Sequence, residues 1–194
     1  MGPVAGDKWR DGSSRRHEGI AHNDGVEMKG AGQLVLYLDF DGVLHHENCL
    51  WHPRRGAYLV APSRYVLFQH VPLLEQLLAP HPSVRIVLST SWVLRYGFSA
   101  TAKRLSPALQ NRVIGATFHS RHMRADDFRN MPRGQQVTED AMRRRPRDWL
   151  ALDDNEEGWP PEHAQRHVHT HMYEGLSDAA VQAEFEQKLK ELRT

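Results

Sequence analysis

Short apolar runs alternate along the chain with segments of helical periodicity, which is the pattern of an α/β protein. Four apolar runs predict core strands, in Leu34–Leu38, Val84–Leu88, "RVIGATF" and "DWLALDDN". The run Val84–Leu88 is apolar almost without interruption, which favours a parallel sheet covered on both faces. The later segment "HVHTHMY" alternates and predicts an edge strand.

Helices are predicted between these strands and at the C-terminal end of the sequence. The expected helices are the leucine-rich part of residues 65–79, Ser99–Leu105, Gln135–Arg144 and a last helix after Ser177. Ser99 and Ser177 are the candidate N-caps, because a serine hydroxyl can accept a backbone N–H at a helix start. The last helix carries one apolar stripe, made by Val181, Phe185, Leu189 and Leu192.

A single domain, residues 33–194, accounts for all of these elements. The spacer between Leu44 and Val84 is about 40 residues long and already holds predicted elements, so it leaves room for a small flap around "AYLV" and for no large cap domain. Residues 119–136 are polar and without periodicity and are expected to form a loop. Residues 1–32 are polar and Gly-rich and are expected to be a poorly ordered leader, with Met28 as a candidate start.

The composition changes this picture little. With 40% hydrophobic and 25% charged residues and a net charge of +1, the chain lies in the ordinary range of soluble proteins. The single cysteine, Cys49, excludes an intrachain disulfide, and no apolar run is long enough for a membrane span or a signal peptide. We therefore expect a cytoplasmic protein without a membrane partner.

One local charge asymmetry stands out in residues 112–147, which hold nine arginines against four carboxylates. A basic stretch of this kind suits a phosphate-rich substrate, although a solvated helix face and loop would look the same.

Three predicted core strands end in polar side chains that can carry chemistry. Asp39 and Asp41 follow the first strand, the hydroxyls of "STS" follow the second, and Asp153 and Asp154 close the fourth. Because ligands bind at the carboxyl ends of parallel strands, these groups can converge although they are far apart in sequence. Gathered carboxylates repel one another unless a cation lies among them, and an oxygen-only set favours Mg²⁺.

These motifs resemble those of the haloacid dehalogenase-like (HAD) phosphohydrolases. "DFDGVL", "IVLSTSW", the arginine of "RGQQVTEDAM" and "LALDDN" match the four HAD motifs in order and spacing, over about residues 33–193. The phrases "YLDFDGVLH", "HPSVRIVLSTSW", "RVIGAT" and "EGLSD" are similar to one branch, the HAD domain of bacterial Swiss Army Knife RNA-repair proteins. The resemblance implies a three-layer, Rossmann-like fold that is capless or has only a small flap.

The resemblance also implies a role for each motif residue. Asp39 would be the nucleophile that forms an aspartyl-phosphate, and Asp41 the general acid and base. Mg²⁺ would be held by Asp39, Asp41 and Asp153, with Asp154 as a helper. The phosphate-binding groups would be Thr90, Ser91 and Arg133; Ser89 competes for the hydroxyl role, and Arg129 competes with Arg133.

The expected function is therefore a Mg²⁺-dependent phosphomonoesterase, with a nucleotide or an RNA end as the preferred phosphorylated substrate. A phosphatase of a small metabolite or phosphoprotein is the alternative among enzymes. From another class, a catalytically weak metal- or phosphate-binding module remains open, because kinship of fold does not decide substrate. The sequence does not indicate an oligomeric state.

Overall fold

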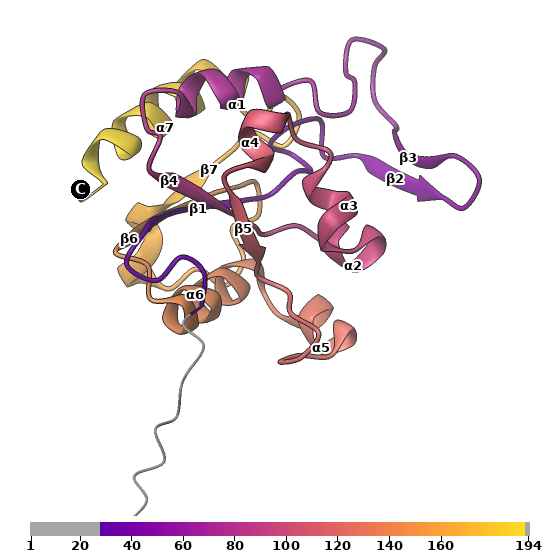
Figure 1. Cartoon of the computed structure of the whole chain (residues 1–194). Coiled ribbons are helices and arrows are strands. Elements are labelled where there is room, and N and C mark those ends of the chain that lie inside the picture. Colours follow the sequence, from indigo (N-terminus) through magenta and orange to yellow (C-terminus); the bar gives the residue numbers. More distant parts are fainter. Residues whose placement is uncertain (1–27, 193–194) are drawn as a thin grey trace, which may run out of the picture.

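The computed structural model describes residues 28–192, and at its centre lies a five-stranded parallel sheet with helices on both faces (Figure 1). The strand order is β5-β4-β1-β6-β7, and a separate antiparallel hairpin is formed by β2 and β3. The strands are β1 (Leu34–Leu38), β2 (Cys49–His52), β3 (Gly56–Leu59), β4 (Val84–Leu88), β5 (Val113–Ala116), β6 (Asp148–Asp153) and β7 (His167–His169). The predicted α/β class, parallel sheet, core strands, edge strand and hairpin flap are confirmed.

The helices connect the strands and cover the sheet. They are α1 (Val71–Leu78), α2 (Trp92–Tyr96), α3 (Phe98–Ala102), α4 (Pro107–Gln110), α5 (Ala125–Asn130), α6 (Arg133–Arg144) and α7 (Ala179–Glu191), with a 3₁₀ helix at Pro161–Arg166. The helices α1 and α7 lie on one face of the sheet and α6 on the other (Figure 1). This arrangement gives three layers, as the motif resemblance implies.

Alternation along β1 divides the hydrophobic core into two parts. Leu34, Leu36 and Leu38 belong to the part that α1 and α7 complete, whereas Val35 and Tyr37 belong to the part completed by α6. All five side chains are buried, which is the expected state of a central strand in a covered parallel sheet. The predicted apolar stripe of α7 is buried in the first part, through Val181, Phe185, Leu189 and Leu192.

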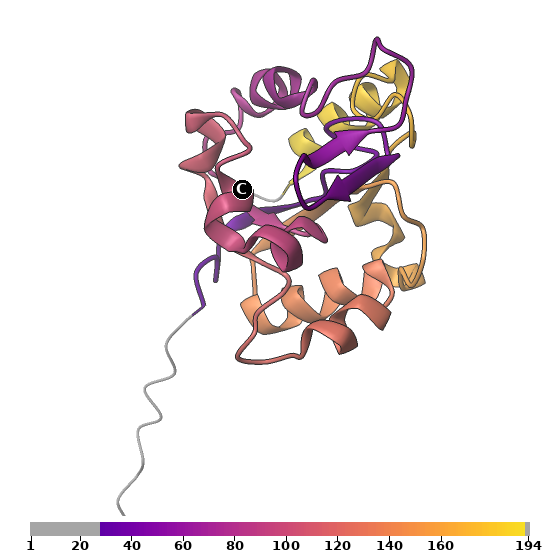
Figure 2. The same ribbon diagram turned by 90° about the vertical axis from the view of Figure 1, so that its right-hand side faces the viewer.

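The register of the sheet brings the motif residues to one level. Leu38 pairs with Leu88 on one side and with Leu152 on the other. Asp39 follows directly on β1 and Asp153 is the last residue of β6, so their carboxylates emerge at the same edge of the sheet. The 90° view shows the β2–β3 hairpin, α2 and the α5–α6 region around this end of the molecule (Figure 2).

Two predictions between β4 and β6 are wrong in detail. The helix expected at Ser99–Leu105 is the shorter α3, which ends at Ala102, and a further short helix, α2, precedes it; the two meet at Gly97, with a φ of 76° that a glycine adopts without strain. The segment 119–136, expected to be a loop, contains α5, and α6 begins at Arg133 rather than at Gln135.

Both predicted serine caps are also wrong. Ser99 lies within α3, and α7 is capped by Asp178, whose carboxylate accepts two backbone N–H groups at 2.8 and 3.1 Å. The Ser177 hydroxyl instead donates to the Glu174 carbonyl at 2.6 Å. The Ser177 hydroxyl is already bonded in the preceding turn, and the Asp178 carboxylate caps the helix instead.

The predicted leader, residues 1–32, falls largely outside the described residues, and only its last five residues are described. There, Gly32 donates its N–H to the Arg145 carbonyl at 3.0 Å, and the Arg144 guanidinium bonds the Lys29 carbonyl. Within residues 28–192, no helix has the length and apolar character needed to cross a membrane.

Candidate active site

Arg133 joins the ends of three strands at the centre of the candidate site. Its Nη2 lies 3.2 Å from Asp39 Oδ2, and its Nε lies 3.1 Å from Asp153 Oδ2. Its Nη1 donates to the Ser89 carbonyl at 2.5 Å. One guanidinium therefore contacts the ends of β1, β4 and β6, and the predicted convergence of the motifs is seen in the structure.

The position of Arg133 depends on the close packing of the first turn of α6. Gly134 donates its N–H to the Glu157 carbonyl at 2.9 Å. A Cβ at Gly134 would lie 2.4 Å from the Trp159 nitrogen and 2.5 Å from the Gly158 carbonyl group. Only glycine lets the helix approach the loop after β6 this closely, and this approach aims Arg133 at the carboxylates.

Three carboxylates share a small buried volume beside Arg133. Oxygens of Asp39, Asp153 and Asp154 lie within 4.8 Å of one another. Burial raises the pKa of Asp39, against the opposing effect of Arg133, and burial together with the Asp39 charge raises the pKa of Asp153 well above its usual value. The same two causes raise the pKa of Asp154 to about 7. Burial and mutual repulsion together outweigh the favourable effect of Arg133 on these carboxylates.

This donor set fits a hard divalent cation. All three ligands are carboxylate oxygens, which Mg²⁺ prefers, and a cation among them would relieve the repulsion that raises their pKa values. Gly42, with a φ of 64°, brings the loop after β1 against this cluster, because a Cβ there would lie 1.9 Å from Asp154 Oδ2. The carboxylates Asp39, Asp153 and Asp154 could thus hold Mg²⁺.

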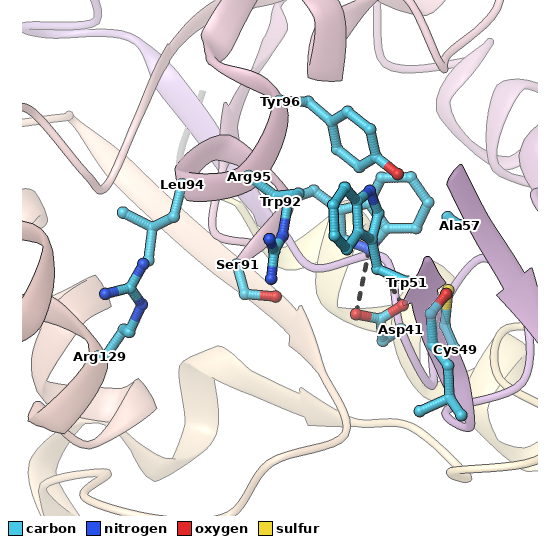
Figure 3. Close-up of a pocket in the computed structure, with 11 residues that line it drawn as sticks. Asp41, Cys49, Trp51, Ala57, Ser91, Trp92, Leu94, Arg95, Tyr96 and Arg129 are labelled. Atoms are coloured by element: carbon cyan, nitrogen blue, oxygen red, sulfur yellow. Dashed lines mark hydrogen bonds between the residues drawn. The ribbon is translucent and has the colours of Figure 1, made fainter. Parts of the chain in front are cut away.

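Asp41 lies apart from this cluster and has its own hydrogen-bond partners. Trp92 Nε1 lies 3.1 Å from each oxygen of the carboxylate (Figure 3). His45 Nε2 lies 3.0 Å from Oδ1. The carboxylate is about one quarter exposed, so it can reach a substrate while both rings fix its orientation. An acid that is held and accessible can exchange a proton with a reacting oxygen.

Neither ring was assigned this contact from the sequence. His45 was not placed among the site residues, yet its side chain is fully buried and packs on Phe68 and Trp92, with centroid distances of 4.8 and 5.8 Å. Within the described residues its Nδ1 has no hydrogen-bond partner. The position of His45 four residues after Asp41 was the available signal, but it could not reveal that the loop turns the ring back.

The hydroxyl cluster and the two candidate arginines occupy different places. Thr90 is buried beside Asp39, and its hydroxyl accepts the Trp92 backbone N–H at 3.4 Å, whereas Ser91 is exposed and lines a pocket beside Asp41. Ser89 is buried with no partner for its hydroxyl among the described residues. Arg129 is exposed and pairs with Asp126 at 2.6 Å, whereas Arg133 contacts Asp39 and Asp153.

Histidines of β7 support the loop that carries the acidic pair. The His167 and His169 rings each hydrogen-bond a backbone carbonyl, of Asp153 and Asp154 respectively, at 3.0 Å. His167 also stacks on Trp159 at a centroid distance of 4.1 Å. The two rings therefore stabilise the backbone of the carboxylate cluster from the neighbouring strand.

The arginine-rich stretch does not form one basic surface. Arg133 lies in the site, and Arg144 is buried against Asp140, with its Nε 2.8 Å from a carboxylate oxygen. Of the exposed arginines in this stretch, Arg129 on α5 lines the pocket beside Asp41.

Comparison with known proteins agrees with this geometry. A family model described as the HAD domain in Swiss Army Knife RNA repair proteins matches residues 35–181, a span that contains every motif residue above. No curated protein and no solved structure matches the chain. The resemblance of the sequence motifs to this branch is thereby confirmed.

Proposed function

The chain belongs to the family of HAD domains found in Swiss Army Knife RNA repair proteins, and from this premise we propose that it is a Mg²⁺-dependent phosphomonoesterase acting on the phosphorylated end of a nucleotide or RNA. The observation that carries the proposal is the division of the two carboxylates after β1. Asp39 lies with Arg133 and the acidic cluster, whereas Asp41 lies with Trp92 and His45. The two groups have separate surroundings that suit separate tasks.

In the first step, Asp39 attacks the phosphorus of the ester. A bond forms between its carboxylate oxygen and phosphorus, and the bond from phosphorus to the ester oxygen breaks with its electron pair going to that oxygen. Protonated Asp41 gives its proton to the departing oxygen. Arg133 and Thr90 bind the phosphoryl oxygens, where negative charge develops.

In the second step, Asp41 takes a proton from a water molecule whose oxygen attacks the same phosphorus. The bond to Asp39 breaks, which restores its carboxylate and releases phosphate. Asp39, Asp153 and the backbone carbonyl of Asp41 would hold Mg²⁺, with Asp154 as a helper. When bound, the ion neutralises charge on the phosphoryl group and so allows an anionic nucleophile to approach.

Substitution of the nucleophile tests the reaction. Asp39→Asn is expected to abolish hydrolysis of p-nitrophenyl phosphate in Mg²⁺, because an amide cannot form the acyl phosphate. Asp127→Asn, which removes an exposed carboxylate on α5, is the matched control and should keep the wild-type rate. An Asp39→Asn enzyme with wild-type turnover would show the covalent mechanism to be wrong.

A substrate panel tests the choice of ester. Oligonucleotides with a 3′- or a 5′-phosphate, mononucleotides and sugar phosphates are compared by kcat/KM under the same Mg²⁺ concentration. We expect the nucleic acid ends to be preferred. Good rates on a sugar phosphate with none on any oligonucleotide would replace this substrate by a small metabolite, and no turnover of any ester would favour a binding module.

A further inference from the structure

A pocket of about 490 Å³ opens beside Asp41, between the β2–β3 hairpin and α2 (Figure 3). Its volume lies within the range of pockets that bind small ligands. The lining comes from the end of β1, from the hairpin, from α2 and, through Arg129, from α5. The pocket is therefore built by segments that the fold brings together around one catalytic residue.

The position of Asp41 tells which part of a substrate enters this pocket. Asp41 lines the pocket, whereas Asp39, Arg133 and the acidic cluster do not. In the proposed reaction Asp41 protonates the departing oxygen, so that oxygen must lie next to its carboxylate. The phosphoryl group belongs on the Asp39 side and the alcohol that leaves belongs in the pocket.

The pocket wall offers a planar aromatic surface. Trp51, on β2, is 40% exposed, and neighbouring Leu50 is 50% exposed. The Arg95 guanidinium lies 4.2 Å from the centroid of the Trp51 ring. An exposed indole with an arginine over it is a surface on which a nucleic acid base stacks, with a further contribution from the cation.

The charges of the lining are the second observation. Arg95 and Arg129 are both exposed and contribute two cations to the wall, and Asp41 is its single carboxylate. Arg129 is paired with Asp126 at 2.6 Å on the solvent side, which is an exposed pair that a phosphate can displace at small cost. Stacking and cationic groups together fit a base and the phosphodiester that follows it.

We propose that this pocket binds the nucleoside that carries the scissile phosphate, with its base stacked on Trp51 and the adjoining phosphodiester beside Arg95 and Arg129. The inference rests on the proposed function, which it deepens by naming the group that leaves. A glycerol in the same place has no planar ring to stack on the indole and no adjoining phosphodiester for the arginines.

Turnover of two matched esters tests this assignment. For Trp51→Ala, kcat/KM on a 3′-phosphorylated dinucleotide should fall about 10-fold or more, given the usual strength of base stacking. The value for glycerol 2-phosphate should stay within about 2-fold, and Trp51→Phe should keep most of the dinucleotide rate. Phe98→Ala, which removes an aromatic side chain that is 43% exposed outside this pocket, should change neither value.

A binding measurement separates the pocket from the reaction. The dephosphorylated dinucleotide should bind the wild-type chain by calorimetry, and Trp51→Ala should weaken it by a similar factor. If this Trp51-dependent binding is present but no ester is hydrolysed, the pocket stands and the proposed function fails. The opposite outcome is hydrolysis of glycerol 2-phosphate with a Trp51→Ala variant whose kcat/KM falls equally for both esters or for neither. In that case the pocket assignment is wrong and the proposed function stands.

Discussion

At the scale of single residues, Asp41 is the group whose surroundings say most about its task. Two ring nitrogens lie within hydrogen-bond distance of one carboxylate, Trp92 Nε1 at 3.1 Å and His45 Nε2 at 3.0 Å. Both come from side chains that are buried, so the orientation of Asp41 is determined by the core rather than by solvent. Positioned acids of this kind contribute about 10²–10⁴-fold to rates.

A first prediction concerns His45 as a positioning residue for this acid. His45→Ala should lower kcat about 10-fold for an alkyl phosphate, a fraction of the usual contribution of general acid catalysis. It should lower kcat less for p-nitrophenyl phosphate, because that leaving group departs without protonation. His45→Gln, which can still place an N–H near Asp41, should recover most of the alkyl rate. Equal losses on both esters in His45→Ala would indicate a purely structural role.

A second prediction follows from the raised pKa of Asp154. Burial and the Asp39 charge raise this pKa to about 7 in the folded protein, against about 3.9 in an unfolded chain. Between these values the folded state binds more protons than the unfolded state, so the free energy of unfolding falls as pH rises. Thermal denaturation in EDTA from pH 4 to pH 8 should show this trend.

Asp154→Asn is the comparison that isolates this group. The variant should lose stability less steeply than the wild type between about pH 4 and pH 7, because its side chain does not titrate. Asp127→Asn, on exposed α5, should follow the wild-type curve. Coincident curves for wild type and Asp154→Asn would mean that Asp154 keeps an ordinary pKa.

At the scale of elements, α6 presents Arg133 at one end and is fixed to the sheet at the other. Asp140 accepts from the Tyr37 hydroxyl at 2.9 Å and from Arg144 Nε at 2.8 Å. All three side chains are buried, and burial together with the Asp140 charge raises the pKa of Tyr37. The same arginine bonds the Lys29 carbonyl, so this network joins β1, α6 and the residues before β1.

A third prediction is that Asp140→Ala destabilises the fold by about 3–5 kcal/mol, because it leaves a buried guanidinium and a buried hydroxyl without their acceptor. Urea denaturation measures the loss. Glu139→Ala, at the neighbouring position, removes only a side chain bonded to Gln135 and should cost less than about 1 kcal/mol. A similar cost for both variants would contradict the importance of the network.

A fourth prediction concerns the first turn of α6. In Gly134→Ala the new methyl group would meet the backbone of the 158–159 segment at about 2.4–2.5 Å, so the helix must shift and move Arg133. We expect a loss of about 1–3 kcal/mol in stability and a fall in kcat of about 10-fold. Gln135→Ala, at an exposed position, should leave kcat unchanged. Normal turnover in Gly134→Ala would show that the position of Arg133 tolerates the shift.

At the scale of the whole molecule, one edge of the sheet collects the chemistry and the opposite edge carries none of the motif residues. The strand order places β1 between β4 and β6, so the residues after these three strands are neighbours by construction. Residues of the hairpin and α2, and Arg129 of α5, line the pocket at the same end. The described residues contain no cap domain over this end of the sheet.

A fifth prediction belongs to this scale, because the proposed Mg²⁺ would join the ends of strands that are distant in sequence. Added Mg²⁺ should raise the midpoint of thermal unfolding by several degrees, since an ion that binds only the folded chain stabilises it by mass action. Asp153→Asn should lose most of this shift, and Asp127→Asn should keep it. An equal shift in Asp153→Asn would place the ion elsewhere.

The fold class, and the position of the candidate site at the carboxyl ends of the strands, follow from local sequence patterns. The apolar runs of β1, β4 and β6 have to be buried and the carboxylates after them resist burial, so the transition marks the end of each strand. Parallel topology then requires these ends to meet. This reasoning identified Asp39, Asp41, Asp153 and Asp154 without any contact being known, because it uses only local polarity.

The contacts of these carboxylates, in contrast, are seen only in the folded chain. Trp92 reaches Asp41 over 51 positions, and Arg133 reaches Asp39 over 94. Such contacts depend on where a turn aims a side chain, as at Gly97 and Gly134, and local patterns do not encode this. The same reason explains why α5 was not predicted. Its Phe128 is buried and packs on Phe118 at a centroid distance of 5.2 Å, and the sequence of α5 has no periodicity that indicates this contact.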